Sequence, residues 1–323
     1  MRKTMGRGAV LAGLGVHLPP GVVTNDMLAE ALDTSDEWIR TRTGIRQRHI
    51  ADPGVGTGDL AVEAGRRALA SAGLSTVDAV LLATTTPDQS CPATAPQVAD
   101  RLGLRGCPAY DVSAACSGFL YLLTTGAALI SSGLFETVLL IGADTFSTTL
   151  DPTDRTTRAL IGDGAGAVVL RAGREGEDGA LLGFDLGSDG SQVDLLVVPP
   201  RGHFQMRGKQ VFTNAVIRMT ESVERVLSGL GWSVESVNHL VPHQANARIL
   251  AAVADQLGLD PARTITNIGD VGNTVAASIP LALAHGVREE RLRPGDRVVL
   301  TGFGAGLTWG AIALTWPGIS ITA

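Results

Sequence analysis

The chain of 323 residues has little cysteine and little aromatic content: three cysteines, and 4% Phe, Trp and Tyr. Cys91, Cys107 and Cys116 are odd in number and form no Cys-x-x-Cys pair or Cys/His cluster, so the sequence predicts no metal site. This cysteine usage best fits a reduced, cytoplasmic setting. Long apolar runs are also missing, which excludes a membrane-spanning role.

Basic residues are scarce as well. Lys and Arg number 26 against 32 Asp and Glu, the net charge is −6, and no basic tail or stripe indicates nucleic-acid binding. The stretch Gly8–Val16 superficially resembles a signal peptide, but its apolar part is short and ends at His17. We interpret it as the first buried strand, because such runs are typical of central strands.

Glycine and aliphatic residues are abundant instead, with 40 Gly and a hydrophobic content of 45%. The length indicates about two domains, or one large duplicated one. Apolar strands such as Ala79–Ala83 alternate with amphipathic helices such as Gly58–Ala72. That alternation predicts an α/β fold with mainly parallel sheets and helices on their faces.

Three segments of the chain recur in the same order and at nearly the same spacing. The pairs are 71–75 with 229–233, 99–104 with 254–259, and 136–142 with 296–302. One such similarity between helix–Gly–strand units could arise by chance, but three in the same order are hard to explain that way. We therefore infer an internal duplication. The predicted halves are residues 1–172 and 173–323, packed around a pseudo-twofold axis. Ligand sites in such sheets lie at the carboxyl ends of strands.

Cys116 lies where a short strand and a tight turn of small residues pass into a long apolar helix. A thiol at a buried helix N-terminus faces unpaired N–H groups and the positive end of the helix dipole, which lower its pKa. The alternative is a core cysteine, since free Cys is often buried. Allowing a two-residue insertion, the duplication makes Asn273 the counterpart of Cys116, at the start of the second central helix.

His243 follows an apolar run at the predicted carboxyl end of a strand, and a helix comes next. A lone histidine there is more often structural, but polar Gln244 and Asn246 share its segment. Asn273 alone would be a helix cap, for which Asn is well suited. A further predicted strand leads into the Gly/Ala loop 302–306. The backbone N–H groups of this loop have no large side chains around them and could stabilise an oxyanion, and the alternative is an ordinary turn between strands.

Cys, His and Asn together admit two chemistries. One is papain-like hydrolysis, in which His activates Cys and Asn orients His. The other is carbon–carbon bond formation on thioesters, in which Cys carries the acyl group while His and Asn bind a thioester enolate. The duplicated α/β pattern favours the second chemistry by analogy at the level of the fold.

Motifs along nearly the whole chain resemble the thiolase superfamily, and closely the β-ketoacyl-acyl carrier protein synthase III family. In family order they are Ser35–Ile39, Thr41–Arg46, Ala114–Phe119, Asp151–Arg155, Gly162–Gly166, Pro242–Asn246, Gly272–Thr274, Ala277–Pro280 and Thr308–Gly310. Any one is weak, but together they are highly specific. The resemblance implies a thiolase-like, five-layered αβαβα fold and a homodimer.

The resemblance also implies a two-step acyltransferase reaction that starts fatty acid or polyketide synthesis without metal or redox cofactor. An acyl-CoA primer acylates Cys116, CoA leaves, and malonyl-acyl carrier protein enters the same tunnel. His243 and Asn273 support decarboxylation, and the carbanion attacks the acyl-cysteine to give a 3-oxoacyl carrier protein. Covalent catalysis splits one difficult condensation into two steps. The implied oxyanion donors are the backbone N–H groups of Cys116 and Ala305.

Binding residues follow from the same resemblance. Trp38 and Arg155 are expected to sandwich the CoA adenine, for which an indole and a flat cation are suited. The expected lining of the pantetheine tunnel is Thr34, Arg42, Gly208, Phe212, Ala245 and Asn246. The residues expected to meet the acidic carrier protein are Gln244, Ala245, Asn246, Ala247 and Arg248. A rim charge such as Arg248 mainly affects association rate and salt dependence.

Three departures from the family pattern concern the acyl pocket and its surroundings. Ala305 stands in a loop that is usually all glycine in the family. The alanine keeps the backbone N–H donor but changes the conformation that the loop can adopt. The loop between Asp189 and Gly208 is shorter than usual and borders the acyl pocket, to which Phe303 is also assigned. Cys91 stands where a bulkier residue often lines the partner subunit's acyl pocket. This smaller residue favours a longer or branched primer, with a buried bystander as the alternative.

Other functions stay open at this stage. A related acyltransferase would pass the acyl group of Cys116 to an alcohol or amine without decarboxylation. A cysteine hydrolase would release it to water, which the apolar helix after Cys116 opposes. A non-catalytic partner subunit is a third possibility, against which the joint presence of Cys116, His243 and Asn273 argues. The sequence does not name the primer or the pathway.

Overall fold

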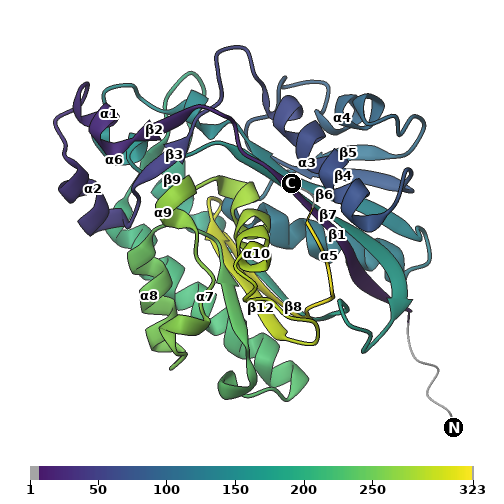
Figure 1. The fold of residues 1–323 in the computed structure, drawn as a ribbon. Coiled ribbons are helices and arrows are strands. Elements are labelled where there is room, and N and C mark those ends of the chain that lie inside the picture. The colour runs from purple at the N-terminus through teal and green to yellow at the C-terminus, as the bar shows by residue number, and fades with distance from the viewer. Residues whose placement is uncertain (1–6, 322–323) are drawn as a thin grey trace, which may run out of the picture.

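The computed structural model describes residues 7–321, and its strands and helices alternate along the chain (Figure 1). The strands are β1 (Arg7–His17), β2 (Val22–Thr24), β3 (Gln47–His49), β4 (Ala79–Ala83), β5 (Ala109–Val112), β6 (Thr137–Asp144), β7 (Gly164–Arg174), β8 (Leu181–Ser188), β9 (Leu196–Val197), β10 (Gln205–Met206), β11 (His239–Pro242), β12 (Arg297–Gly304) and β13 (Thr308–Thr315). The α-helices are α1 (Asn25–Ala29), α2 (Asp36–Thr43), α3 (Thr57–Ala72), α4 (Ala95–Arg101), α5 (Gly118–Ser131), α6 (Arg155–Arg158), α7 (Gly208–Leu230), α8 (Ala247–Gln256), α9 (Ile268–Val271) and α10 (Ser278–Arg288). Three short 3₁₀ turns matter for the site: η1 (Ala115–Ser117), η2 (Phe146–Thr149) and η6 (Val275–Ala277).

Two sheets repeat the same strand order. The first runs β1-β7-β6-β4-β5 and the second β8-β13-β12-β11. In both, the first two pairings are antiparallel and the next is parallel. On its other side β4 pairs in parallel with β5, whereas the other side of β11 has an isolated parallel bridge from Leu240 to Thr264. This repetition fits an internal duplication. The sheets are mixed rather than mainly parallel, because β7 and β13 return antiparallel to the strands before them.

Five layers follow from the way these sheets bury their faces. Leu139 and Ile141 of β6 pack under the outer helices α3 and α4, whereas Val138 and Leu140 face a core shared with α5 and α10. Successive strand residues point to opposite faces, so an all-apolar strand such as β6 is covered on both sides. Helices α7 and α8 cover the second sheet from outside, and α5 and α10 lie between the sheets (Figure 1). The predicted αβαβα fold is confirmed.

The N-terminal apolar run forms β1, as predicted, and it pairs with β7 along its length. A Cβ on Gly15 would stand 2.2 Å from the backbone nitrogen of Ala68, so glycine lets α3 approach this strand closely. Within residues 7–321, none of the helices is long and apolar enough to cross a membrane. The predicted division between residues 172 and 173 falls near the end of β7, and the boundary of the halves stays a prediction.

The turns η1 and η6 lead into the two central helices in the same way. Each begins on a non-glycine residue with positive φ, Ala115 at 46° and Val275 at 50°. In this register Cys116 corresponds to Ala276, so the prediction that Asn273 is the counterpart of Cys116 is wrong. Asn273 lies before η6. The repeated sequence segments can be aligned with or without an insertion, so they do not determine which residues correspond. The shared backbone conformation of η1 and η6 does determine it.

Candidate active site

Cys116 lies in η1, two residues before α5 begins, and its thiol is partly accessible from a cavity. Burial and, to a lesser extent, the negative charge of Asp144 together raise the pKa of this thiol to about 12. The expected lowering of the pKa by the helix N-terminus is therefore wrong for this environment. At neutral pH the thiol carries its proton, so attack on a thioester requires a group that accepts it.

His243 lies at the carboxyl end of β11, as predicted, and is almost completely buried. Its Nδ1 is 2.6 Å from the Oγ of Ser278, and its backbone N–H donates to the carbonyl of Thr301 at 2.7 Å. Burial lowers the pKa of His243 to about 3, so the imidazole is neutral at physiological pH. Its Nε2 is left for a ligand in the cavity that His243 lines.

Asn273 faces the same cavity from the C-terminal half. Its side-chain Oδ1 accepts a hydrogen bond of 3.0 Å from the backbone N–H of Val275. Its backbone bonds to Leu160 at 2.8 Å and to Gly162 at 3.0 Å. Because the carbonyl oxygen is engaged, the NH₂ group of the side chain is left to donate to a ligand. The structure thus brings Cys116, His243 and Asn273 together on one cavity.

The loop between β12 and β13 lies against the cysteine. A Cβ on Gly304 would stand 2.7 Å from the backbone nitrogen of Cys116, so only glycine allows this approach. The hydroxyl groups of Ser117 and Thr308 are 2.6 Å apart, and that of Thr308 donates to the carbonyl of Ala305 at 2.9 Å. These contacts hold Ala305 beside Cys116 on the cavity wall. Their joint role as oxyanion donors stays a prediction.

The cavity has a volume of about 700 Å³ and mostly apolar walls. These walls come mainly from η2, the β9–β10 hairpin and α7, with residues that include Phe146, Leu196, Phe204, Met206 and Phe212. Phe146 and Phe204 pack edge to face with ring centroids 5.1 Å apart. Such walls exclude water from an acyl chain and strengthen electrostatic interactions at the polar groups.

Comparison with known proteins shows the family to which the chain belongs. A family model described as 3-oxoacyl-[acyl-carrier-protein (ACP)] synthase III matches residues 110–190, and the model of its C terminal matches residues 227–316. A β-ketoacyl-[acyl-carrier-protein] synthase III of Pseudomonas aeruginosa is 62% identical, covering 98% of each chain. The chain belongs to the β-ketoacyl-[acyl-carrier-protein] synthase III family. The predicted family and its acyltransferase activity are confirmed.

Solved structures show the same relationship to the synthase III family. The 3-oxoacyl-(acyl carrier protein) synthase III of Pseudomonas aeruginosa PAO1 matches with a TM-score of 0.96 and 63% identity, covering 97% of this chain and 100% of that one. The priming β-ketosynthase of the R1128 polyketide biosynthetic pathway matches with a TM-score of 0.91 and 33% identity, covering 98% of both chains. Members with this fold thus include one that primes a polyketide pathway.

The predicted adenine site for this synthase III member is occupied by its own side chains. The guanidinium of Arg155 lies 5.0 Å from the centroid of the Trp38 ring, and that of Arg42 lies 4.7 Å from it. Arg155 is also held by the backbone carbonyl and the carboxylate of Asp33. At 5.0 Å the cation already contacts the indole, so a purine enters between them only after Arg155 swings away.

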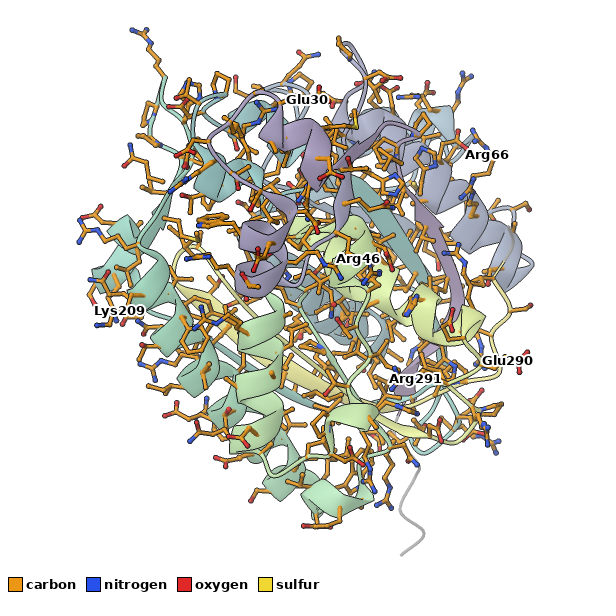
Figure 2. The ribbon with its side chains drawn as sticks, turned by 60° about the vertical axis from the view of Figure 1, so that its left-hand side comes forward. Glu30, Arg46, Arg66, Lys209, Glu290 and Arg291 are labelled. Carbon is orange, nitrogen blue, oxygen red and sulfur yellow. The ribbon has the colours of Figure 1, made fainter. Side chains whose placement is uncertain are left out.

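The residues predicted for the pantetheine tunnel divide into two groups. Those that line the cavity are Gly208, Phe212, Ala245 and Asn246. Thr34 and Arg42 are not on its wall; Arg42 is exposed, and the Nδ2 of Asn246 donates to its carbonyl at 3.1 Å. Lys209, which the sequence analysis did not single out, also lines the cavity and projects from the start of α7 at the surface (Figure 2).

The residues predicted to meet the carrier protein also divide. Gln244 is fully buried, and its amide nitrogen donates to the carbonyl of Pro242 at 2.7 Å. Its oxygen accepts from the hydroxyl of Thr266 at 2.9 Å. Gln244 therefore supports the loop and is closed to a partner, contrary to the prediction. Ala245, Asn246 and Ala247 are partly buried, whereas Arg248 is exposed and lies over the Phe212 ring.

The two residues assigned to the acyl pocket have different surroundings. Phe303 is buried on the cavity wall together with Cys116. Cys91 is exposed and does not line the cavity of its own chain. The resemblance assigns Cys91 to the pocket of the partner subunit, so its role stays a prediction.

Asp144 is the residue of the site that sequence reasoning missed. It ends β6, is fully buried, and its Oδ2 accepts from the backbone N–H of Ala276 at 3.1 Å. Burial raises the pKa of this carboxyl to about 6. An Asp that follows an apolar run ordinarily indicates a turn, and for this reason Asp144 was not predicted as a site residue. The signal that would have found it is its place at the carboxyl end of a central strand, where ligand sites lie.

Proposed function

We propose that this synthase III member transfers an acyl group from acyl-CoA to Cys116 and condenses it with malonyl-acyl carrier protein. The observation that carries the proposal is the convergence of a thiol, a neutral imidazole and an oriented amide on one apolar cavity. Both substrates are those implied for the family. Membership of this family also speaks against the hydrolase alternative.

In the first step, a bond forms between the Sγ of Cys116 and the acyl carbon, and the carbon–sulfur bond to CoA breaks. The Cys116 thiol is protonated at rest, so His243 accepts its proton through Nε2, and the departing CoA thiolate leaves as the thiol. For this, the Nδ1 of His243 carries a hydrogen and donates to Ser278. The products are acyl-Cys116 and CoA.

In the second step, the malonyl thioester loses CO₂ and leaves an enolate whose oxygen accepts hydrogen bonds from His243 and Asn273. For this, Nε2 of His243 takes up a proton from solvent in the cavity and Nδ1 gives its own proton up, so that Nε2 donates to the enolate. Nδ1 then accepts from Ser278, whose hydroxyl can donate or accept. The enolate carbon attacks the acyl carbon, and the backbone N–H groups of Cys116 and Ala305 stabilise the oxyanion. Collapse releases the 3-oxoacyl carrier protein and leaves the thiolate of Cys116, which takes up the one proton that the step consumes from solvent.

We further propose that the enzyme works in the cytoplasm as a homodimer that pairs through β5. This strand is an edge of the first sheet, and its Tyr110 is exposed. An open edge readily accepts a strand of another chain, and a twofold axis there would use the same patch on both copies. Cys91 is exposed on the loop before α4, the helix that packs on β5, where a partner would cover it. Light scattering on the purified protein tests the dimer.

The deciding experiment is intact-mass analysis after incubation with a panel of acyl-CoA thioesters, alongside Cys116→Ala. We expect a gain of one acyl group that is absent in the variant, and the best-loading thioester names the primer class. Malonyl-acyl carrier protein should then discharge the enzyme, with release of CO₂ and of a 3-oxoacyl carrier protein. Discharge to an alcohol or amine instead would establish the simple acyltransferase. Loading from acyl carrier protein alone would contradict the priming role.

A further inference from the structure

Asp144 connects the two halves of the enzyme directly beneath the cysteine. Its Oδ1 accepts from the backbone N–H of Thr85 at 2.8 Å and from the hydroxyl of Thr85 at 2.7 Å. Its Oδ2 accepts from the N–H of Ala276, in the turn that corresponds to η1 in the other half. Thr85 lines the cavity with Cys116, so the carboxylate is one residue removed from the reacting groups.

The turn that Asp144 holds is also the turn that orients Asn273. Two successive backbone N–H groups point to different acceptors: that of Val275 to the side chain of Asn273, and that of Ala276 to Asp144. Val275 has a φ of 50°, which a β-branched residue adopts only when its surroundings impose it. Loss of the Asp144 contact would therefore loosen the residue that fixes the amide of Asn273.

No cation balances the charge of Asp144 among residues 7–321. Its hydrogen-bond donors are the end of β4, through Thr84, Thr85 and Thr86, and the N–H of Ala276 in η6. Through Thr86 this cluster reaches Thr57 of α3, which is neutral as well. The titratable group that feels the charge is the thiol of Cys116. An uncompensated carboxylate in a buried site acts strongly on such a neighbour.

We propose that Asp144 is a positioning residue of the condensation reaction, which holds Thr85 and the η6 turn in place. The proposal rests on the proposed function, since it assigns the condensation step to Asn273. It separates two consequences of one carboxylate. Its hydrogen bonds fix the geometry of Asn273, and its charge limits the reactivity of the free thiol.

The test uses Asp144→Asn in the full-length enzyme, with iodoacetamide as the probe of the thiol. Removing the negative charge should lower the pKa of Cys116 and speed alkylation at pH 8 by about tenfold, equivalent to about one pKa unit. The same variant should lose about tenfold or more in kcat for condensation, with a smaller change in the KM for acyl-CoA. General loosening of the fold would also expose the thiol, so the urea unfolding midpoint of the variant is measured alongside. Faster alkylation at an unchanged midpoint, together with slower condensation, is the result that the proposal requires.

Asp163→Asn is the matched control. Asp163 is also fully buried and accepts from the N–H of Ala51 and from the N–H and hydroxyl of Ser147. Asp163 does not itself line the cavity, although it holds η2, whose Phe146 and Thr149 do. Its variant should lower thermal stability without speeding alkylation of Cys116. Equal alkylation rates of Asp144→Asn and the wild type would overturn the proposal. Alkylation requires no condensation, so this arm is independent of the proposed function.

If Asp144→Asn does not fold, Thr85→Val carries the test. It removes one hydroxyl donor from the carboxylate, which raises the pKa of Asp144 above about 6 and lowers its charge near neutral pH. Alkylation of Cys116 should then be severalfold faster than in the wild type at pH 7 and equal to it at pH 9, where Asp144 is ionised in both. Equal rates at both pH values would contradict the proposal.

Discussion

In the N-terminal half, η1 leads into α5 and carries Cys116, whereas η6 leads into α10 in the C-terminal half and carries Ala276 at the matching position. Cys116 is partly accessible, but Ala276 is only 1% exposed. The strands beneath the turns also differ. A Cβ on Gly142 would stand 2.5 Å from the carbonyl oxygen of Ala276, while a Cβ on Gly302 would stand 3.7 Å from that of Cys116.

This difference shows how a duplicated fold divides one reaction between its halves. The tighter contact, from β6 to η6, supports a turn that performs no chemistry itself and holds Asn273 through its backbone. Gly302 of β12 leaves more space beneath η1, although Gly304 of the same strand approaches Cys116 closely, and the thiol of Cys116 is reached from the cavity. In the proposed mechanism the first half therefore supplies the nucleophile, and the second supplies the groups that bind the enolate.

The largest expected effect comes from breaking this division at Asn273. Asn273→Ala should still load an acyl group on Cys116, because that step uses no donor from Asn273. Condensation with malonyl-acyl carrier protein should fall by about 10²–10³-fold, the usual cost of one lost donor to a developing oxyanion. Intact mass reports loading, and release of CO₂ reports the second step. Loss of both steps together would mean that the halves do not divide the reaction in this way.

A second prediction compares the glycines beneath the two turns. Gly142→Ala should destabilise the enzyme by about 2–3 kcal/mol, since its Cβ meets the backbone of η6, which lacks room to move. Gly302→Ala meets only the Cβ of His243 and a methyl group of Leu120 at 3.3 Å, and should cost less than about 1 kcal/mol. Urea unfolding measures both variants. Similar losses would remove the asymmetry between the turns.

Much of this arrangement could be predicted from the chain. The duplicated order, the first strand, and the placement of Cys116 and His243 at the carboxyl ends of strands follow from apolar periodicity and turn residues, which are local properties. The register of the duplication could not be predicted, because it depends on the positive φ of Ala115 and Val275, and neither residue type indicates such a conformation.

Long-range burial accounts for what the sequence misassigned. Gln244 stands among residues predicted to meet the carrier protein, yet its side-chain amide is buried and hydrogen-bonds to Ile265 and Thr266, about twenty residues away. The pKa of Cys116 depends on burial by both halves and on Asp144, and these effects outweigh the local one of a helix N-terminus. Neither the burial of Gln244 nor the raised pKa of Cys116 can be recognised from the residues next to it in the sequence.

A third prediction concerns the acid sensitivity of the C-terminal sheet. The pKa of His243 is about 3 in the folded enzyme, below its ordinary 6.5, so its stabilising contribution is present above pH 6.5 and is lost as pH falls toward 3. Between pH 7 and pH 5 this loss is on the order of 2 kcal/mol. His243→Gln should lose less stability over that interval. In the first half β4 ends at Ala83, which cannot titrate.

The control for this prediction is the opposite behaviour of Asp144. The pKa of Asp144 is raised to about 6, so its contribution to stability increases as pH falls from 6 toward 4. Both proteins contain Asp144, and the difference between the wild type and His243→Gln therefore isolates the histidine. Denaturant unfolding at pH 7 and pH 5 measures it. An equal loss in both proteins would show that His243 does not remain neutral on folding.

The smallest effects are expected at two arginines, one from each half, that lie over aromatic rings. Arg155 lies over Trp38, and Arg248 lies over Phe212 on the side of α7 and α8. Arg155→Ala should raise the KM for acyl-CoA by about two- to fivefold, as expected for an exposed cation–π contact, and should leave the KM for malonyl-acyl carrier protein nearly unchanged. Arg248→Ala should do the reverse, with a penalty that shrinks as salt is added, because a rim charge acts mainly on the association rate. Initial rates at two ionic strengths, with each substrate varied in turn, measure both variants. Equal effects of each variant on both substrates would mean that the two halves share one entrance without dividing the substrates between them.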